Sequence, residues 1–176
     1  LLPSLLEARR INESLANPVI ELFETASIYL AGDGELPLEQ WTLAISSGGG
    51  YYRLKGIVEG LLAALKIDIP LEVKEVDLPL LDLSRSGELR LDNRKLGFLG
   101  EASPEGLKTF SLRNPTSLVE LNLDLLAELA ELVIRRAAMT SRVQATELAL
   151  YDQVRRGHNG RAVARVERGA CEGCRV

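Results

Sequence analysis

The stretch PSLLEARRINESLANPVIELFETASIYL, residues 3–30, decides how the fold begins. Residues 1–16 predict a helix, and Asn17-Pro18 ends it because proline disfavours the helical region in the residue before it. Residues 19–30 then alternate, imperfectly, between apolar and polar side chains and indicate a strand. A helix that leads into a long strand therefore opens the chain.

This first helix has one apolar face. The face is formed by Leu2, Leu5, Leu6 and Leu15. The charged residues of the helix are Glu7, Arg9, Arg10 and Glu13. The four charged side chains are expected elsewhere on the helix, away from the leucines.

Two more segments extend the pattern. In YYRLKGIVEGLLAAL, residues 51–65, apolar residues recur at i, i+3, i+4, i+7, i+8 and i+11 from Leu54, so residues 54–65 predict a helix with one apolar stripe. In KLGFLGEASPEGLKTF, residues 95–110, Ser103 and Pro104 are typical of an N-cap and a first helical turn. A short helix to about residue 110 is expected there.

Shorter patterns predict the remaining elements. Strands are predicted at residues 41–46, 71–76 and 118–123. A flexible turn is predicted at Gly48-Gly49-Gly50. A hairpin that joins residues 89–91 to residues 95–99 is predicted at Asp92-Asn93-Arg94. Gly97 and Gly100 suit a bulge or a close backbone approach, whereas Gly56 either permits close packing against a strand or is only tolerated in its helix. This order predicts an α+β fold, an antiparallel sheet flanked by helices, with the helices on one face.

Charge divides the chain near residue 130. The first 130 residues contain 12 basic and 20 acidic residues, and residues 131–176 contain 9 and 5. Two pieces with different partners, or ordinary surface variation, both explain this asymmetry. The sequence has no apolar run of membrane-spanning length and no signal peptide, so no membrane partner and a cytoplasmic location are expected. Without an initiator methionine, the chain is expected to be a fragment of a longer one.

Taken in order and spacing, the three quoted segments resemble the catalytic-like core of the beta subunit of phenylalanyl-tRNA synthetase, over about residues 1–126. The resemblance implies a class II synthetase-like fold without an active site. It also implies packing against the alpha subunit, which carries ATP, phenylalanine and the acceptor end of tRNA. Cofactors are therefore expected only in the whole complex, as ATP and magnesium, and tRNA is an indirect partner.

Two segments depart from the family pattern. Ala102-Ser103-Pro104 follows Glu101 where bacterial members usually have His-Pro, and Leu83-Ser84-Arg85-Ser86-Gly87 is a reduced His-Pro-Gly-Arg-Ser-like stretch. Glu101 either accepts backbone donors at the helix that follows or is a solvated charge.

The sequence does not have the arginines with which an active class II enzyme binds ATP phosphates, and Gly48-Gly49-Gly50 is not a phosphate-binding loop. His158, the only histidine, has no evident catalytic partner and is interpreted as a turn residue. We therefore expect no catalytic residues in this chain. A catalytic domain of the related biotin-ligase or synthetase kind is a rival interpretation, which ATP-dependent adenylate formation would support.

The second expected domain covers residues 127–176. Residues 124–156 contain no glycine or proline and predict one long helix, which residues 157–160 stop. Residues 161–166 predict a strand or the arm of a hairpin. This tail resembles the front half of a four-cysteine zinc-ribbon protein, in which a long helical hairpin precedes the ribbon. Cys171 and Cys174 would then be half of a zinc site, because a tetrahedral site needs four ligands.

The tail leaves alternatives open. Cys171 and Cys174 are otherwise two free thiols or a redox pair. The arginines of residues 135–175 also suit a nucleic-acid-binding or regulatory zinc-ribbon module that contacts phosphates. This module is the alternative to a synthetase role for the chain.

Overall fold

The structure is a computed structural model that describes residues 1–176 except 33, 35, 158–161, 164–165, 168–169 and 172–176. The chain forms two compact units, Leu1–Glu131 and Leu132–Val176, and each is described by itself. In the described part of the chain, no helix is long and apolar enough to cross a membrane.

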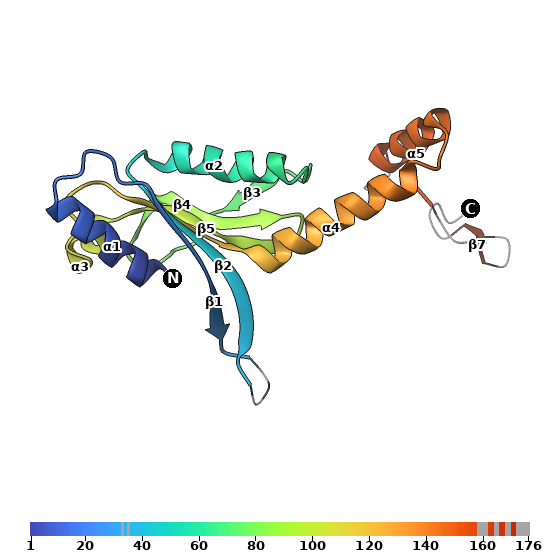
Figure 1. The fold of residues 1–176 in the computed structure, drawn as a ribbon. Coiled ribbons are helices and arrows are strands. Elements are labelled where there is room, and N and C mark those ends of the chain that lie inside the picture. The colour runs from blue at the N-terminus through green and yellow to red at the C-terminus, as the bar shows by residue number, and fades with distance from the viewer. Residues whose placement is uncertain (33, 35, 158–161, 164–165, 168–169, 172–176) are drawn as a thin grey trace. The chain divides into compact units, whose positions relative to one another are not determined.

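The first unit is built on one antiparallel sheet of six strands (Figure 1). The strands are β1 (Leu22–Leu30), β2 (Leu38–Ser47), β3 (Leu71–Lys74), β4 (Leu81–Leu91), β5 (Arg94–Ala102) and β6 (Ser117–Asn122). They lie in the order β1-β2-β6-β5-β4-β3. The helices are α1 (Leu2–Ser14), α2 (Tyr51–Ala64), α3 (Pro104–Thr109) and the start of α4 (Leu123–Thr140). The predicted α+β class with an antiparallel sheet is confirmed.

Helices cover both faces of this sheet, so the expectation of a single covered face is wrong. Adjacent residues of a strand point to opposite faces, and in β6 both Leu118 and Val119 are buried. Val119 packs in the cluster that contains Leu54 of α2, whereas Leu118 packs with Leu6 of α1. Figure 1 shows α2 above the sheet and α1 and α3 below it. A central strand that is apolar on both faces requires a layer on each side.

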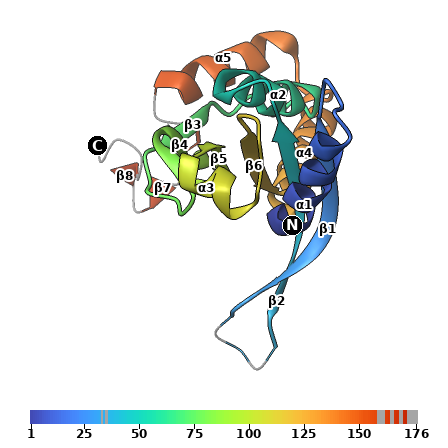
Figure 2. The same ribbon diagram turned by 90° about the vertical axis from the view of Figure 1, so that its left-hand side faces the viewer.

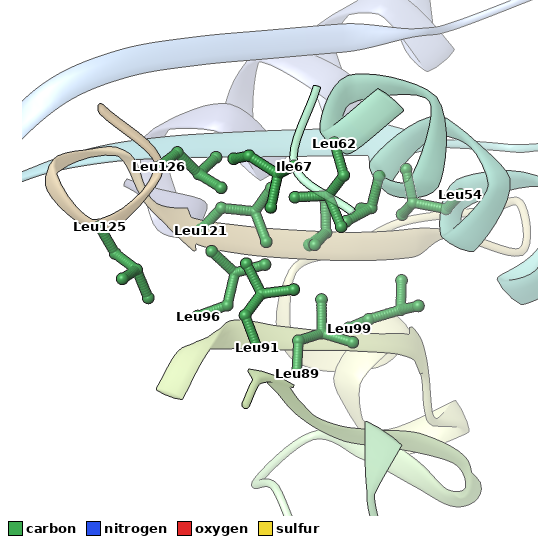
Figure 3. Packing of buried hydrophobic residues seen from close by; sticks show 12 residues of the cluster. Leu54, Leu62, Ile67, Leu89, Leu91, Leu96, Leu99, Leu121, Leu125 and Leu126 are labelled. Carbon is green, nitrogen blue, oxygen red and sulfur yellow. The ribbon is translucent and has the colours of Figure 1, made fainter. Parts of the chain in front are cut away.

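The main core lies between α2 and the middle of the sheet (Figure 3). The predicted stripe of α2 points into it, with Leu54, Val58 and Leu62 all buried. The sheet contributes Leu89, Leu91, Leu96, Leu99, Val119 and Leu121, and the first turn of α4 contributes Leu125 and Leu126. At about 1.5–3 kcal/mol for each fully buried side chain, this cluster is a main source of the unit's stability.

Local signals placed several elements correctly. The β4–β5 hairpin turns at Asp92, where the backbone φ is +52°, as the predicted turn requires. Ser103 caps α3, because its hydroxyl accepts the Gly106 N–H at 3.1 Å. A Cβ on Gly97 would lie 1.9 Å from the Glu120 carbonyl oxygen, so the expected close backbone approach is present there. Gly56 has nothing within 4 Å of such a Cβ and is therefore only tolerated in its helix.

The second unit contains the end of α4, α5 (Ala145–Gly157) and a short hairpin of β7 (Val166–Glu167) and β8 (Ala170–Cys171). The predicted single helix over residues 124–156 is wrong, because α4 ends at Thr140. At this end the hydroxyls of Thr140 and Ser141 donate to backbone carbonyls three residues earlier and compete with the helix ladder. Arg136 and Asp152, 2.7 Å apart, then pair the two helices as a hairpin.

Candidate functional site

A polar cluster surrounds the first turn of α2, and we call it the α2 clasp: Gly50, Tyr51, Arg85 and Glu101. One oxygen of Glu101, on β5, accepts the Tyr51 N–H at 2.8 Å, and the other accepts from the Arg85 guanidinium of β4 at 2.8 Å. Gly50, the N-cap residue, has φ of +82° and no side chain with which to cap the helix. Glu101 therefore supplies the missing cap. It binds the start of α2 rather than α3, and it is not a solvated charge.

Opposing effects set the charge of Glu101. Partial burial raises the pKa of its carboxyl. The Arg85 guanidinium and the Tyr51 N–H together lower this pKa by more than burial raises it, so the pKa lies below its usual value. The start of a helix is a natural anion-binding position. In the clasp this position is filled by a carboxylate of the chain itself, which holds the structure together instead of leaving the position to a ligand.

The clasp borders an open hollow of about 700 Å³. The hollow is lined by Tyr51, Tyr52, Lys55, Val73, Ser84, Arg85, Ser86 and Glu101. Its two principal cations already have carboxylate partners, since Lys55 pairs with Glu59 and Arg85 with Glu101. Among the residues that the structure describes, no group of three or more His, Cys, Asp or Glu side chains could hold a metal ion. The two hydrogen bonds of Glu101 join the start of α2 to β4 and β5.

The clasp predicts a pH-dependent contribution to stability. Replacing Glu101 by glutamine should lower the free energy of unfolding by about 1 kcal/mol at pH 7, comparable to the loss of a helix cap. The folded-state pKa lies below the unfolded value, so the carboxylate stabilises the fold above about pH 4.3. As the pH falls through the folded-state pKa, this contribution disappears. Urea unfolding at pH 7 and pH 3 should show the difference between wild type and Glu101→Gln shrinking toward zero; a difference that grows would contradict the clasp.

A second polar cluster was missed by the sequence analysis. Arg9 and Glu13 of α1 are 2% and 6% exposed, and their side chains pair at 3.5 Å. Arg9 also donates to the Ile20 carbonyl at 2.8 Å, and Glu13 accepts the Arg113 N–H at 2.7 Å. The expectation that both residues lie away from the buried face is therefore wrong. Leu15, expected on that face, is 69% exposed.

An exposed aromatic surface lies on the β1–β2 ribbon. Cross-strand pairing of Phe23 with Ile45 and of Ser27 with Trp41 places these residues, with Tyr29, on one face of the sheet. We call Phe23, Tyr29 and Trp41, with the half-buried Leu43 and Ile45, the β1–β2 aromatic face. Phe23 is 75% exposed, Tyr29 67% and Trp41 51%. Figures 1 and 2 show the ribbon extending beyond the other strands of the sheet.

The predicted zinc and turn residues lie largely outside the described part of the chain. His158 and Cys174 are not described. The backbone of Cys171 pairs with Val166 in the β7–β8 hairpin. Zinc binding at Cys171 and Cys174 stays a prediction.

The fold of the first unit is that of an aminoacyl-tRNA synthetase core. It matches the crystal structure of pyrrolysyl-tRNA synthetase from Desulfitobacterium hafniense with a TM-score of 0.57 and 18% identity, over 77% of this chain and 48% of that one. A second structure of the same enzyme, PylSc, matches with a TM-score of 0.58 and 19% identity, over 78% of this chain and 49% of that one. At this identity the likeness establishes the fold.

Sequence relatives identify the family within this class. The family model described as the phenylalanyl tRNA synthetase beta chain CLM domain matches residues 1–123, and the chain belongs to this family. It is 30% identical to the phenylalanine–tRNA ligase beta subunit of Clostridium acetobutylicum, over 72% of this chain and 16% of that protein. It is 32% identical to that of Rhodopirellula baltica, over 80% and 22%. The chain thus spans about a fifth of the length of these relatives. The matches do not test the zinc-ribbon resemblance of the tail.

Proposed function

We propose that the first unit is a non-catalytic core of a phenylalanine–tRNA ligase beta subunit and supports attachment of phenylalanine to tRNA by packing against the alpha subunit. In this proposal ATP, magnesium and the acceptor end of tRNA belong to the whole complex, in the cytoplasm. Membership of the beta-chain family supports the beta-subunit role. The observation that carries the proposal is the β1–β2 aromatic face.

Side-chain exposure supports one position for the proposed interface. Two apolar surfaces of the first unit are candidates for this interface, the sheet and the helix α2, which contains Leu54. Leu54, Val58 and Leu62 of that helix are buried in the unit's own core, so most of its apolar stripe is not available to a partner. On the β1–β2 aromatic face, Phe23, Tyr29 and Trp41 are each more than half exposed. Large exposed apolar patches on soluble proteins commonly mark interaction sites, and buried aromatic anchors often dominate binding energy.

The α2 clasp supports a role without catalysis. In an active class II enzyme, an arginine must be available to bind phosphate. Arg85, which lies beside the hollow, is bound by Glu101, and Glu101 is also bound to the start of α2. Releasing Arg85 would leave the Glu101 carboxylate, which caps α2, without its cationic partner. The clasp therefore favours a scaffold over a phosphate-binding site.

Binding to the alpha subunit tests the proposal. The full chain is mixed with the alpha subunit from the same source, and the dissociation constant is measured by calorimetry. The double substitution Phe23→Ser/Trp41→Ser should weaken binding at least about 100-fold, because it removes two aromatic anchors. Tyr52→Ser is the matched control: Tyr52 is 86% exposed but lies on α2, and its loss should change binding less than about twofold.

Two results would overturn the proposal. Failure of the wild-type chain to bind the alpha subunit would reject the partner. Equal weakening by Tyr52→Ser and by the double substitution would reject the aromatic face as the interface. Circular dichroism of every variant confirms that the fold is retained, which is expected because all three aromatic side chains are exposed.

A further inference from the structure

The helical hairpin of the second unit contains an apolar groove with a basic rim. We call it the hairpin groove; its volume is about 610 Å³. We call its uncharged lining residues the floor: Leu132, Met139, Thr140, Val143, Leu148 and Tyr151. We call its basic lining residues the rim: Arg135, Arg136 and Arg155. All of these residues belong to the second unit, so the groove is independent of the β1–β2 aromatic face.

The groove is not the hairpin's own core. No residue of α5 is buried. On the floor, Met139 is 73% exposed, Leu132 49%, Val143 44% and Tyr151 41%. Two helices that pack only on each other leave much of their apolar surface in water, and an apolar helix face normally lies against another element. The floor is therefore a surface that a further element would cover.

The net charge of the hairpin indicates which kind of element would cover the floor. Between residues 132 and 157 the hairpin contains five arginines and two acidic residues, Glu147 and Asp152, a balance of +3. A second copy of the hairpin would bring the same charge and be repelled. The negative charge of a nucleic acid would complement the rim arginines, but its phosphates would have no binding partners on the apolar floor. A helix with an apolar face and acidic flanks matches both parts of the groove.

We propose that the hairpin groove binds an acidic amphipathic helix of a partner protein. Its apolar side chains, at i, i+3, i+4 and i+7 spacing, lie on the floor, and its carboxylates lie along the arginine rim. The Arg136–Asp152 ion pair, at 2.7 Å, joins α4 to α5 beside the groove. This inference concerns the second unit and goes beyond the proposed role of the first.

Model peptides test the groove by fluorescence anisotropy with the full chain. The probe is a labelled 18-residue helix with a leucine stripe flanked by glutamates, and micromolar binding is expected. Replacing its glutamates by lysines, or its leucines by serines, should each weaken binding at least about 10-fold. Met139→Ser/Val143→Ser in the chain should do the same. Ile134→Ser is the matched control, since Ile134 is 68% exposed on the same helix but does not line the groove.

Several outcomes would overturn the inference. They are the absence of peptide binding, equal binding of the lysine peptide, and equal weakening by Ile134→Ser. Tighter binding of a labelled RNA or DNA oligonucleotide than of the glutamate peptide would assign the groove to nucleic acid. A dimer in sedimentation that Met139→Ser/Val143→Ser dissociates would assign it to a second copy. Phe23→Ser/Trp41→Ser should leave peptide binding unchanged, which separates this result from failure of the alpha-subunit proposal.

Discussion

Replacing Glu13 by alanine is expected to lower the free energy of unfolding by about 3–5 kcal/mol, the cost of removing one partner from a buried ion pair. The substitution would leave the Arg9 guanidinium, in a residue 2% exposed, without its carboxylate. It would also leave the part-buried Arg113 N–H without its acceptor, the Glu13 carboxylate 2.7 Å away. Burial already lowers the pKa of Arg9, and Glu13 is the main charge that opposes this effect.

Urea unfolding followed by circular dichroism measures the loss. The matched control is Glu7→Ala, which removes an i, i+3 ion pair with Arg10 on the exposed side of the same helix and should cost far less than Glu13→Ala, because solvent screens exposed ion pairs. The double variant Arg9→Met/Glu13→Leu should recover most of the stability, because well-packed apolar residues often replace a buried ion pair at little cost. A loss below about 1 kcal/mol for Glu13→Ala would show that the pair is solvated.

This pair shows where sequence reasoning stops. A charged residue is expected at the surface because burying it alone is very costly. Arg9 and Glu13 follow Leu5 at i+4 and i+8, so helical spacing alone could have placed them on the buried face. What makes their burial possible is the Ile20 carbonyl, the Arg113 N–H and each other. Two of these three partners are fixed only by tertiary structure.

The clasp was beyond prediction for the same reason. Glu101 and Tyr51 are 50 residues apart, and nothing local connects them. Local signals succeeded where one segment contains both partners, as in the cap that Ser103 gives to α3 or the stripe of α2. They failed at Thr140, where a helix ends without glycine or proline. There the hydroxyl bonds and the Arg136–Asp152 pair, rather than a helix breaker, give the hairpin.

Replacing Gly97 even by alanine should destabilise the fold. This substitution is the clearest test of how closely β5 and β6 approach in the sheet. A Cβ at this position would lie 1.9 Å from the Glu120 carbonyl oxygen, a backbone atom of the neighbouring strand β6. No rotamer change relieves such a contact, so β5 and β6 would have to separate where Leu96, Leu99 and Leu121 pack. We expect Gly97→Ala to lower the free energy of unfolding by about 3 kcal/mol or more, at or above the usual cost of overpacking.

The same substitution at Gly56 should have the opposite sign. Gly56 lies inside α2, and nothing lies within 4 Å of a Cβ there. Gly56→Ala should therefore stabilise the chain by about 0.5–1 kcal/mol, because alanine has the higher helix propensity. Thermal unfolding of both variants beside wild type measures the contrast. Equal effects of the two substitutions would show that β5 and β6 are not held at the backbone distance on which the six-stranded sheet depends.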